Sequence, residues 1–217
     1  MKSSRNVSII LNTLIILFEI IGITIYVLNN PYFDLVYYTH DSNLLALITS
    51  TIYLFFILRK KELPKWASLL KYTSTLALTI TFLIVLFVLI PMDHFNFEFY
   101  LFNKAMLYFH LICPILALIS FLFFEKHKIS GLKDNIRALY YTVIYTIVLL
   151  STFSTNETIM VIRSNMFKTD QGLGYGFSSA IAWVYSIIVL LFLGIAALLF
   201  KNKKDKKAAV LYANRKR

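Results

Sequence analysis

Three groups of polar residues interrupt long apolar stretches, and their side chains are of the types that could do chemistry. The first group is the run at residues 38–43, the second surrounds His110, and the third is centred on Glu19. Polar and ionisable groups within a membrane are costly, usually face the interior of a helix bundle and often mark functional sites. These three groups are therefore the candidates for a functional site.

The first group reads Tyr-Thr-His-Asp-Ser-Asn and opens a helix-forming segment. At helical spacing, Thr39, Ser42 and Asn43 share one face. The same face continues through Ala46, Thr49 and Ser50. Such a small, polar stripe is expected to point at other helices, where helix capping and interhelical hydrogen bonding are the alternative to a functional role. His40 and Asp41 lie off this stripe, and a capping role is favoured for both.

The second and third groups each allow two interpretations. His110 can transfer protons or serve as a structural group, and Pro114 removes the backbone hydrogen bond to residue 110 and frees that carbonyl. The face that carries His110 also carries Cys113, Pro114, Ala117 and Ser120. Glu19 shares a face with Asn12 and Gly22. It is interpreted either as a proton relay or as a hydrogen-bonded structural acid.

Several familiar chemistries are disfavoured by the sequence. His40, Asp41 and His110 could supply metal ligands, but their spacing is generic, and a metal hydrolase needs three or more ligands. There is no Gly-x-Ser-x-Gly elbow of a serine hydrolase and no glycine loop that would cradle a phosphate. We therefore expect neither a metal nor another cofactor.

The elements that must position these residues are membrane-spanning helices. Of the 217 residues 59% are hydrophobic and 15% are charged, which is too apolar for a soluble domain of this length. Mean hydropathy is +0.70. A span needs about 20 apolar residues. The sequence predicts an all-α, polytopic membrane protein, an antiparallel bundle of six transmembrane helices within residues 1–200. The helices are expected at about 7–28, 38–58, 69–90, 105–124, 138–155 and 176–200.

The distribution of Lys and Arg predicts the orientation of the bundle. Nineteen of these residues fall on one side of the six spans and three on the other, so both termini are expected in the cytoplasm. The second connection, in which we count Lys71, contributes five of the nineteen, and the tail at 201–217 contributes eight. The net charge of +11 therefore reflects topology and contact with anionic lipid, and no nucleic-acid partner is expected.

Two of the polar groups lie at matched depth and carry a family resemblance. Thr39 is about one turn into its helix and His110 about one and a half turns into a helix of the same direction. The segment Tyr38-Thr39-His40-Asp41-Ser42-Asn43-Leu44-Leu45 resembles the aromatic-Thr-x-x-Ser/Thr-Asn-Leu-Leu segment of the androgen-induced and androgen-dependent transmembrane hydrolases and their bacterial six-helix relatives. His110-Leu111-Ile112-Cys113-Pro114-Ile115-Leu116 resembles their His-x-x-x-Pro-Leu/Ile-Leu segment, and Tyr140 to Tyr145 resembles their tyrosine-bearing fifth helix.

The resemblance implies an intramembrane hydrolase of fatty acid esters of hydroxy fatty acids. It places the catalytic threonine at Thr39 and the catalytic histidine at His110. Thr39 would be the nucleophile and His110 the base that takes its proton. Ser42 and Asn43, on the Thr39 face, are expected to donate hydrogen bonds to the oxyanion. Two further groups, Glu19 and Asp41, are the candidates for polar support that orients His110.

Two other functions compete with hydrolysis. In a small proton-coupled transporter, Glu19 and His110 would form a proton path. In a non-catalytic structural or interaction protein, the polar residues would only hold helices together. Under each of the three, the expected surroundings are the lipid bilayer of the plasma membrane, and under the first the substrate is lipid-like. The sequence identifies no protein partner.

Overall fold

The structure is a computed structural model that describes residues 2–30, 35, 37–129 and 131–153. The described part of the chain contains helices and no strands. Elements labelled η are π-helical segments; η1, η3 and η4 are continuous with the α-helices next to them, whereas η2 lies in the connection between α4 and η3. The elements are α1 (Lys2–Asn29), α2 (Tyr38–Leu58), α3 (Lys65–Ile84), η1 (Val85–Leu89), α4 (Ile90–Met92), η2 (Glu98–Phe102), η3 (Leu107–Ile112), α5 (Cys113–Ile119), η4 (Ser120–Phe124) and α6 (Gly131–Phe153).

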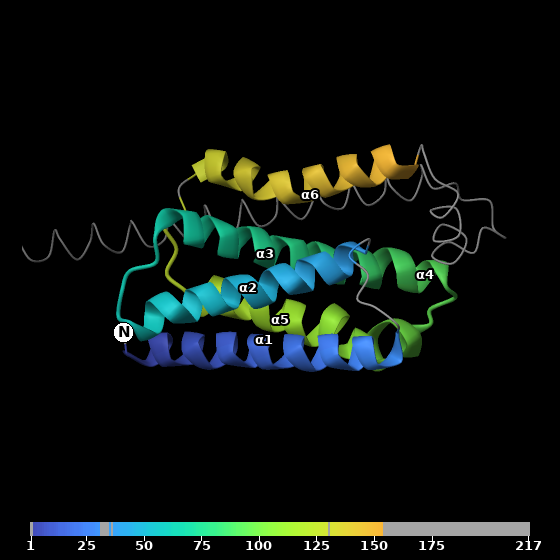
Figure 1. Cartoon of the computed structure of the whole chain (residues 1–217), viewed down its shortest axis with the longest axis horizontal. Helices are drawn as coiled ribbons and strands as arrows, with labels where there is room; N and C mark the ends of the chain where they lie inside the picture. Colours follow the sequence, from blue (N-terminus) through green and yellow to red (C-terminus); the bar gives the residue numbers. More distant parts are fainter. Residues whose placement is uncertain (1, 31–34, 36, 130, 154–217) are drawn as a thin grey trace, which may run out of the picture.

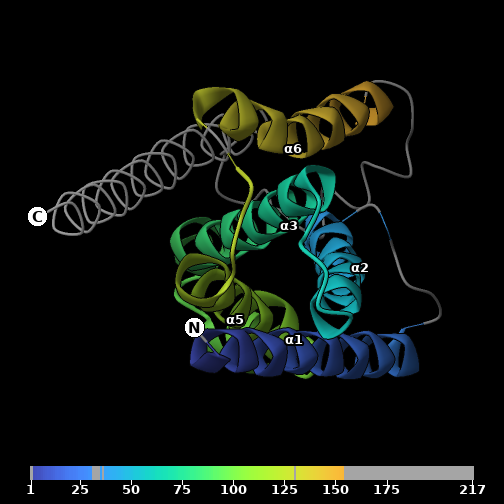
Figure 2. The same ribbon diagram turned by 90° about the vertical axis from the view of Figure 1, so that its left-hand side faces the viewer.

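Four long helical rods form an antiparallel ring. The third rod is α3 with η1 and α4, and the fourth is η3 with α5 and η4. Successive rods run in opposite directions along the long axis of the molecule (Figure 1). α1 packs against α2, α2 packs against α3, and α5 contacts both α1 and α3 (Figure 2). α6 lies outside this ring, against α3.

The four rods are long and apolar enough to cross a membrane. These candidate spans are Ser4–Asn29, Tyr38–Leu58, Lys65–Met92 and Leu107–Phe124, in agreement with the first four predicted helices. The chain is therefore a multi-pass membrane protein. The predicted fifth helix at 138–155 corresponds to α6, which begins at residue 131 and is not one of the four candidate spans. The predicted sixth helix at 176–200 and the tail at 201–217 lie outside the described residues, so a count of six spans stays a prediction.

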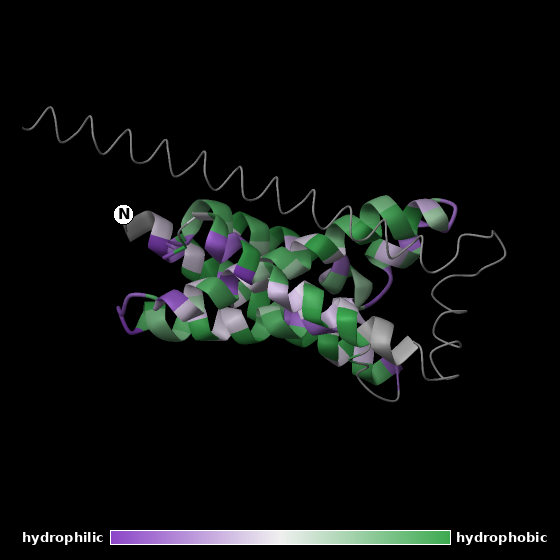
Figure 3. Ribbon diagram, turned by 90° about the horizontal axis from the view of Figure 1, so that it is seen from above, coloured by the Kyte–Doolittle hydropathy of each residue, from purple (hydrophilic) through white to green (hydrophobic). Residues whose placement is uncertain are grey.

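The bundle has apolar residues on its surface and polar residues inside. Exposed large hydrophobic side chains occur along all four rods and α6, and include Ile10, Phe55, Phe87, Phe123 and Ile147. Figure 3 shows hydrophobic residues along most of each ribbon, with hydrophilic ones at the ends and at points between. The buried polar residues of the interior include Asn12, Glu19, Asn43, Lys71 and His110. This distribution is typical of a membrane protein, in which apolar side chains face the lipid and polar side chains face the bundle interior.

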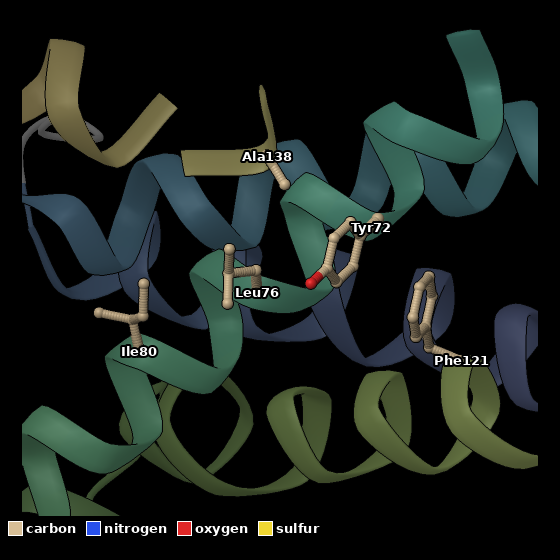
Figure 4. Packing of buried hydrophobic residues seen from close by; sticks show 5 residues of the cluster. All are labelled: Tyr72, Leu76, Ile80, Phe121 and Ala138. Carbon is tan, nitrogen blue, oxygen red and sulfur yellow. The ribbon is translucent and has the colours of Figure 1, made fainter. Parts of the chain in front are cut away.

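Apolar clusters hold the rods together between the polar groups. In the largest, Tyr72, Leu76 and Ile80 of α3 meet Phe121 of η4 and Ala138 of α6 (Figure 4). The rings of Tyr72 and Phe121 are stacked, with their centroids 5.3 Å apart. A second cluster takes one residue from each rod and forms a layer across the ring. This layer consists of Ile15, Ala46, Leu78 and Ala117.

Ion pairs tie together two connections at the same end of the bundle. Glu62 follows α2, and its Oε2 lies 2.8 Å from Nζ of Lys128, which follows η4. The Lys128 ammonium lowers the pKa of the exposed Glu62 carboxyl by hydrogen bonding and charge attraction. Asp134 of α6 pairs with Lys65 of α3 at 3.1 Å. The end with these connections is the basic end predicted to be cytoplasmic.

One residue counted with this basic end lies elsewhere. The charge pattern of the sequence places Lys71 with the connection before the third span, but this residue lies inside α3 and is 1% exposed. The span extends back to Lys65, because α3 begins directly after Pro64, which suits a helix start. The charge asymmetry remains large without Lys71.

Reporter fusions test the orientation. Fusions after residues 62, 130 and 210 should give cytoplasmic signals, and fusions near residues 95 and 165 should give external signals, because Lys and Arg are retained on the cytoplasmic side. Paired alkaline phosphatase and fluorescent-protein fusions measure the two states independently. Reversed signals at two or more of these positions would contradict the orientation.

Candidate functional site

The structure brings Thr39 and His110 together. Thr39 is the second residue of α2 and His110 lies in η3, and these two rods run in the same direction. Oγ1 of Thr39 is 3.4 Å from Nε2 of His110. His110 is 6% exposed, whereas Thr39 is half-buried. This distance is longer than the 2.6–3.2 Å or so of a formed proton-transfer contact, as is common in enzymes without substrate.

The hydrogen bond made by Nδ1 of His110 determines the tautomer of the ring and therefore which nitrogen can accept a proton. Nδ1 lies 2.7 Å from the backbone carbonyl oxygen of Tyr100, in η2. A carbonyl oxygen only accepts hydrogen bonds, so the proton of a neutral imidazole sits on Nδ1. Nε2 then carries the free lone pair and faces the Thr39 hydroxyl. This is the tautomer that a general base needs to take a proton from Thr39.

The groups expected to donate to an oxyanion instead hold the backbone at Thr39. Nδ2 of Asn43 lies 2.7 Å from the carbonyl oxygen of Thr39 and 3.3 Å from that of Phe109. Oγ of Ser42 lies 3.0 Å from the Thr39 carbonyl oxygen and 2.9 Å from Oγ1 of Thr81. These contacts indicate that Asn43 and Ser42 position the first turn of α2 against the neighbouring rods. An oxyanion role for them stays a prediction.

Pro114 explains why a backbone carbonyl is available to Asn43. In an α-helix it would leave the carbonyl of residue 110 without a donor. η3 is π-helical, however, and the Cys113 N–H donates to the carbonyl of Tyr108, five residues earlier. In that register the carbonyl that faces Pro114 is the one of Phe109, and it accepts the contact from Asn43. The proline thus creates the acceptor that links the two rods of the site.

Aromatic packing supports the site from behind. The ring of Phe109 is fully buried, and its centroid is 5.7 Å from that of His40 and 6.3 Å from that of Tyr26. His40 is 3% exposed and also packs edge-on against Tyr26 and Tyr37. His40 lies off the polar stripe of α2 by helical spacing but is buried all the same, because its ring packs against α1 and η3.

Gly22 allows α1 to approach η3 closely. A Cβ atom at this position would lie 2.8 Å from the ring of Phe109 and 3.0 Å from Cβ of Tyr108. Neither neighbour can give way cheaply, because one ring is enclosed by aromatic side chains and the other atom is fixed to the backbone. The glycine that shares a face with Glu19 thus has a packing role beside the site.

A methyl group at Gly22 should disturb both packing and geometry. We expect Gly22→Ala to lower stability by about 1–3 kcal/mol, the usual cost of overpacking. The overpacking should lower the thermal midpoint of unfolding. Because Phe109 precedes His110, a shift of Phe109 should also lengthen the contact between Thr39 and His110. Thermal unfolding of the purified variant measures the effect, and Gly131→Ala, in open space at the start of α6 but at a positive φ of 73°, provides the backbone-strain control. An unchanged midpoint for Gly22→Ala would contradict this packing.

The two acids considered as partners of His110 lie in other surroundings. Asp41 is in the first turn of α2 and interacts electrostatically with Tyr38 and Tyr141. Glu19 is fully buried in α1 beside Cys113. The group that orients the imidazole of His110 is instead the Tyr100 carbonyl, which accepts the hydrogen bond from Nδ1. Sequence patterns carry no signal for it, since any residue supplies a carbonyl and only the fold of the 93–106 connection brings this one to the histidine.

Metal binding is not supported by the described residues. Within this part of the chain, no group of three His, Cys, Asp or Glu side chains is placed to hold a metal ion. His40, Asp41 and His110 therefore do not form the ligand set that their types would allow.

No protein-family model matches the chain, and neither curated proteins nor solved structures give a significant match to it. The geometry of the site and the character of its surroundings are thus the basis for a functional proposal.

Proposed function

We propose that this membrane protein is a threonine hydrolase of lipid esters, with Thr39 as nucleophile and His110 as general base. The observation that carries the proposal is the chain of contacts from Thr39 Oγ1 through the imidazole to the Tyr100 carbonyl. A nucleophile, a base of the correct tautomer and a group that orients the base are the three parts of an activated hydroxyl.

The residues permit a balanced two-step reaction. In acylation, Nε2 of His110 takes the hydroxyl proton while Oγ1 of Thr39 bonds to the ester carbonyl carbon. The tetrahedral intermediate then breaks its bond to the alcohol oxygen, which receives the proton from Nε2. In deacylation, water gives a proton to Nε2 and attacks the acyl carbon, and the released Oγ1 takes that proton back. The fatty acid and the regenerated threonine are the products.

Two features make His110 suitable for this cycle. Burial in a low-dielectric environment disfavours a charged imidazole at rest, which keeps Nε2 ready to accept a proton. When the ring becomes positive during the reaction, its Nδ1–H still donates to the Tyr100 carbonyl. A hydrogen bond from an ionised donor is stronger than a neutral one, so this contact stabilises the charged intermediate.

The surroundings of the site favour a lipid as substrate. The connection that contributes the Tyr100 carbonyl exposes four phenylalanine side chains: Phe95, Phe97, Phe99 and Phe102, each at least 45% exposed. Exposed apolar rings at the end of a span suit burial at the boundary between headgroups and acyl chains. A long-chain ester dissolved in the outer leaflet would meet these rings beside the half-buried hydroxyl of Thr39.

An ester-cleavage assay tests the proposal. The purified full-length chain in lipid nanodiscs is incubated with a long-chain fatty acid ester of a hydroxy fatty acid, and the released acid is measured by mass spectrometry. We expect release that increases with protein concentration. If no long-chain ester of a tested series is cleaved above the level of empty nanodiscs, the polar interior serves a structural purpose.

A further inference from the structure

Three ionisable side chains lie in the interior away from Thr39 and His110. Lys71 of α3 is 1% exposed, Glu19 of α1 is 0% exposed, and Glu125, directly after η4, is 9% exposed. Lys71 is among the largest fully buried side chains in the described part of the protein. Burial of three such groups is costly, and inside a membrane protein they mark a functional site by default.

Lys71 and Glu125 each lie in a hydrogen-bonded group towards the end predicted to be cytoplasmic, and the two groups are linked by charge. Nδ2 of Asn12 lies 2.8 Å from Oε1 of Glu125 and 3.0 Å from Oγ of Ser120. That hydroxyl donates to the same carboxylate oxygen at 2.7 Å. Nζ of Lys71 donates to Oγ of Ser50 at 2.8 Å, and its charge interacts with Glu125.

Glu19 lies on the other side of an apolar layer. It is one helical turn beyond Ile15, which forms this layer with Ala46, Leu78 and Ala117. Cys113, one turn beyond Ala117, is its neighbour on the fourth rod. The charge of Lys71 reaches Glu19 as well as Glu125, so all three groups are electrostatically linked through the layer.

The cluster has more acceptors than donors. Four buried oxygens have no hydrogen-bond partner: Glu19 Oε1, Glu19 Oε2, Glu125 Oε2 and Asn12 Oδ1. The Asn12 amide is itself 0% exposed and its Nδ2 points at Glu125, so its free oxygen belongs to the same interior. Buried acceptors are normally satisfied, and additional donors are therefore expected here as water or protons.

The charges of the cluster do not balance when all groups are ionised. Lys71 provides one positive charge, and the two glutamates would provide two negative ones. An uncompensated charge in a low-dielectric interior costs far more free energy than a neutral group. Oε1 of Glu125 accepts hydrogen bonds from Asn12 and Ser120. Glu19 has only the Cys113 thiol, a weak donor, beside it and is the group left to hold a proton.

We propose that Glu19, Lys71 and Glu125 form a proton-binding site in the bundle interior, in which Glu19 carries one exchangeable proton and the positive charge of Lys71 compensates one negative charge. The ligand of this site is the proton, with water as the further donor to the free oxygens. Two other titratable groups interact with these side chains. Cys113 of α5 lies beside Glu19, and Tyr53 of α2, whose hydroxyl donates to Ser8 at 3.1 Å, interacts electrostatically with Glu125 and with Arg5 of α1. The site does not depend on ester hydrolysis at Thr39.

Infrared spectroscopy of the full-length protein in nanodiscs tests this site. A protonated carboxylic acid has a carbonyl stretching band that a carboxylate lacks. We expect such a band at neutral pH in the wild-type protein, its loss in Glu19→Gln, and its loss on raising the pH as the proton is released. Glu98→Gln is the matched control, because Glu98 is an exposed acid in η2 and its amide should leave the band unchanged.

Two further samples keep the test decisive. In Lys71→Met the carboxylate of Glu125 loses its counter-charge, so a second carboxylic acid band should appear. Wild-type protein with ¹³C-labelled glutamate should show the band at a lower frequency, which assigns it to a glutamate without any substitution. Thr39→Ala should retain the band, which separates this site from the hydrolase proposal. A wild-type protein without the band, or a band that persists in Glu19→Gln, would overturn the proposal.

Discussion

Thr39→Ala should abolish ester hydrolysis while the protein remains folded. The substitution removes the only atom that can bond to the acyl carbon, and loss of a nucleophile typically reduces kcat by about 10⁴-fold or more. The alanine methyl fits where the threonine side chain was, and the position is only half-buried. Released fatty acid per mole of folded protein is the quantity to measure, with the thermal midpoint as the check on folding.

Thr39→Ser is the matched variant for this prediction. It retains the hydroxyl and its contact with His110 and loses one methyl group, so part of the activity should remain. The contrast between serine and alanine separates chemistry from packing. Equal turnover by wild-type protein and Thr39→Ala on an ester that both cleave would show that Thr39 is a structural residue.

His110→Ala should lose turnover for a different reason, the absence of a base. General-base catalysis contributes about 10²–10⁴-fold, and the effect should fall on kcat because the proton moves only in the reaction step. The variant also leaves the Tyr100 carbonyl without its donor. A lost buried hydrogen bond costs about 1–3 kcal/mol, so a lower thermal midpoint should accompany the loss of activity.

His40→Ala is the control for a buried imidazole near the site. Its ring packs against Tyr26, Tyr37 and Phe109. Truncation leaves a cavity and should lower the thermal midpoint. Hydrolysis per folded molecule should stay close to that of the wild-type protein. Loss of turnover in His40→Ala equal to that in His110→Ala would contradict the assignment of the base.

The sequence predicts the four described spans because membrane insertion depends on hydropathy, which is a local property. The inward face of α2 can also be predicted from the sequence, because helical spacing alone brings one set of residues to the same side. These residues are Ser42, Asn43, Ala46, Thr49 and Ser50, and the structure buries all five. The same argument holds for His110 and Cys113 on the fourth rod. Depth along parallel rods then predicts that Thr39 and His110 lie near each other.

Other parts of the site could not be predicted, because they depend on backbone geometry and on contacts between distant elements. The π-helical register of η3 shifts the carbonyl freed by Pro114 from residue 110 to Phe109. The group that orients His110 is a backbone carbonyl, which no side-chain pattern reveals. Lys71 was counted as a connection residue because its charge matches the basic end of the bundle, while only packing shows that its ammonium is buried against Ser50.

Covalent labelling of the wild-type protein tests the central claim most directly. A fluorophosphonate probe reacts with an activated hydroxyl, which displaces fluoride and keeps the phosphonyl group on its oxygen. The purified full-length chain is treated with the probe, digested and analysed by mass spectrometry, with Thr39→Ala and His110→Ala treated in parallel. The account predicts a phosphonylated Thr39 in the wild-type protein and no labelling in either variant. An unlabelled wild-type protein, or labelling confined to another residue, would contradict it.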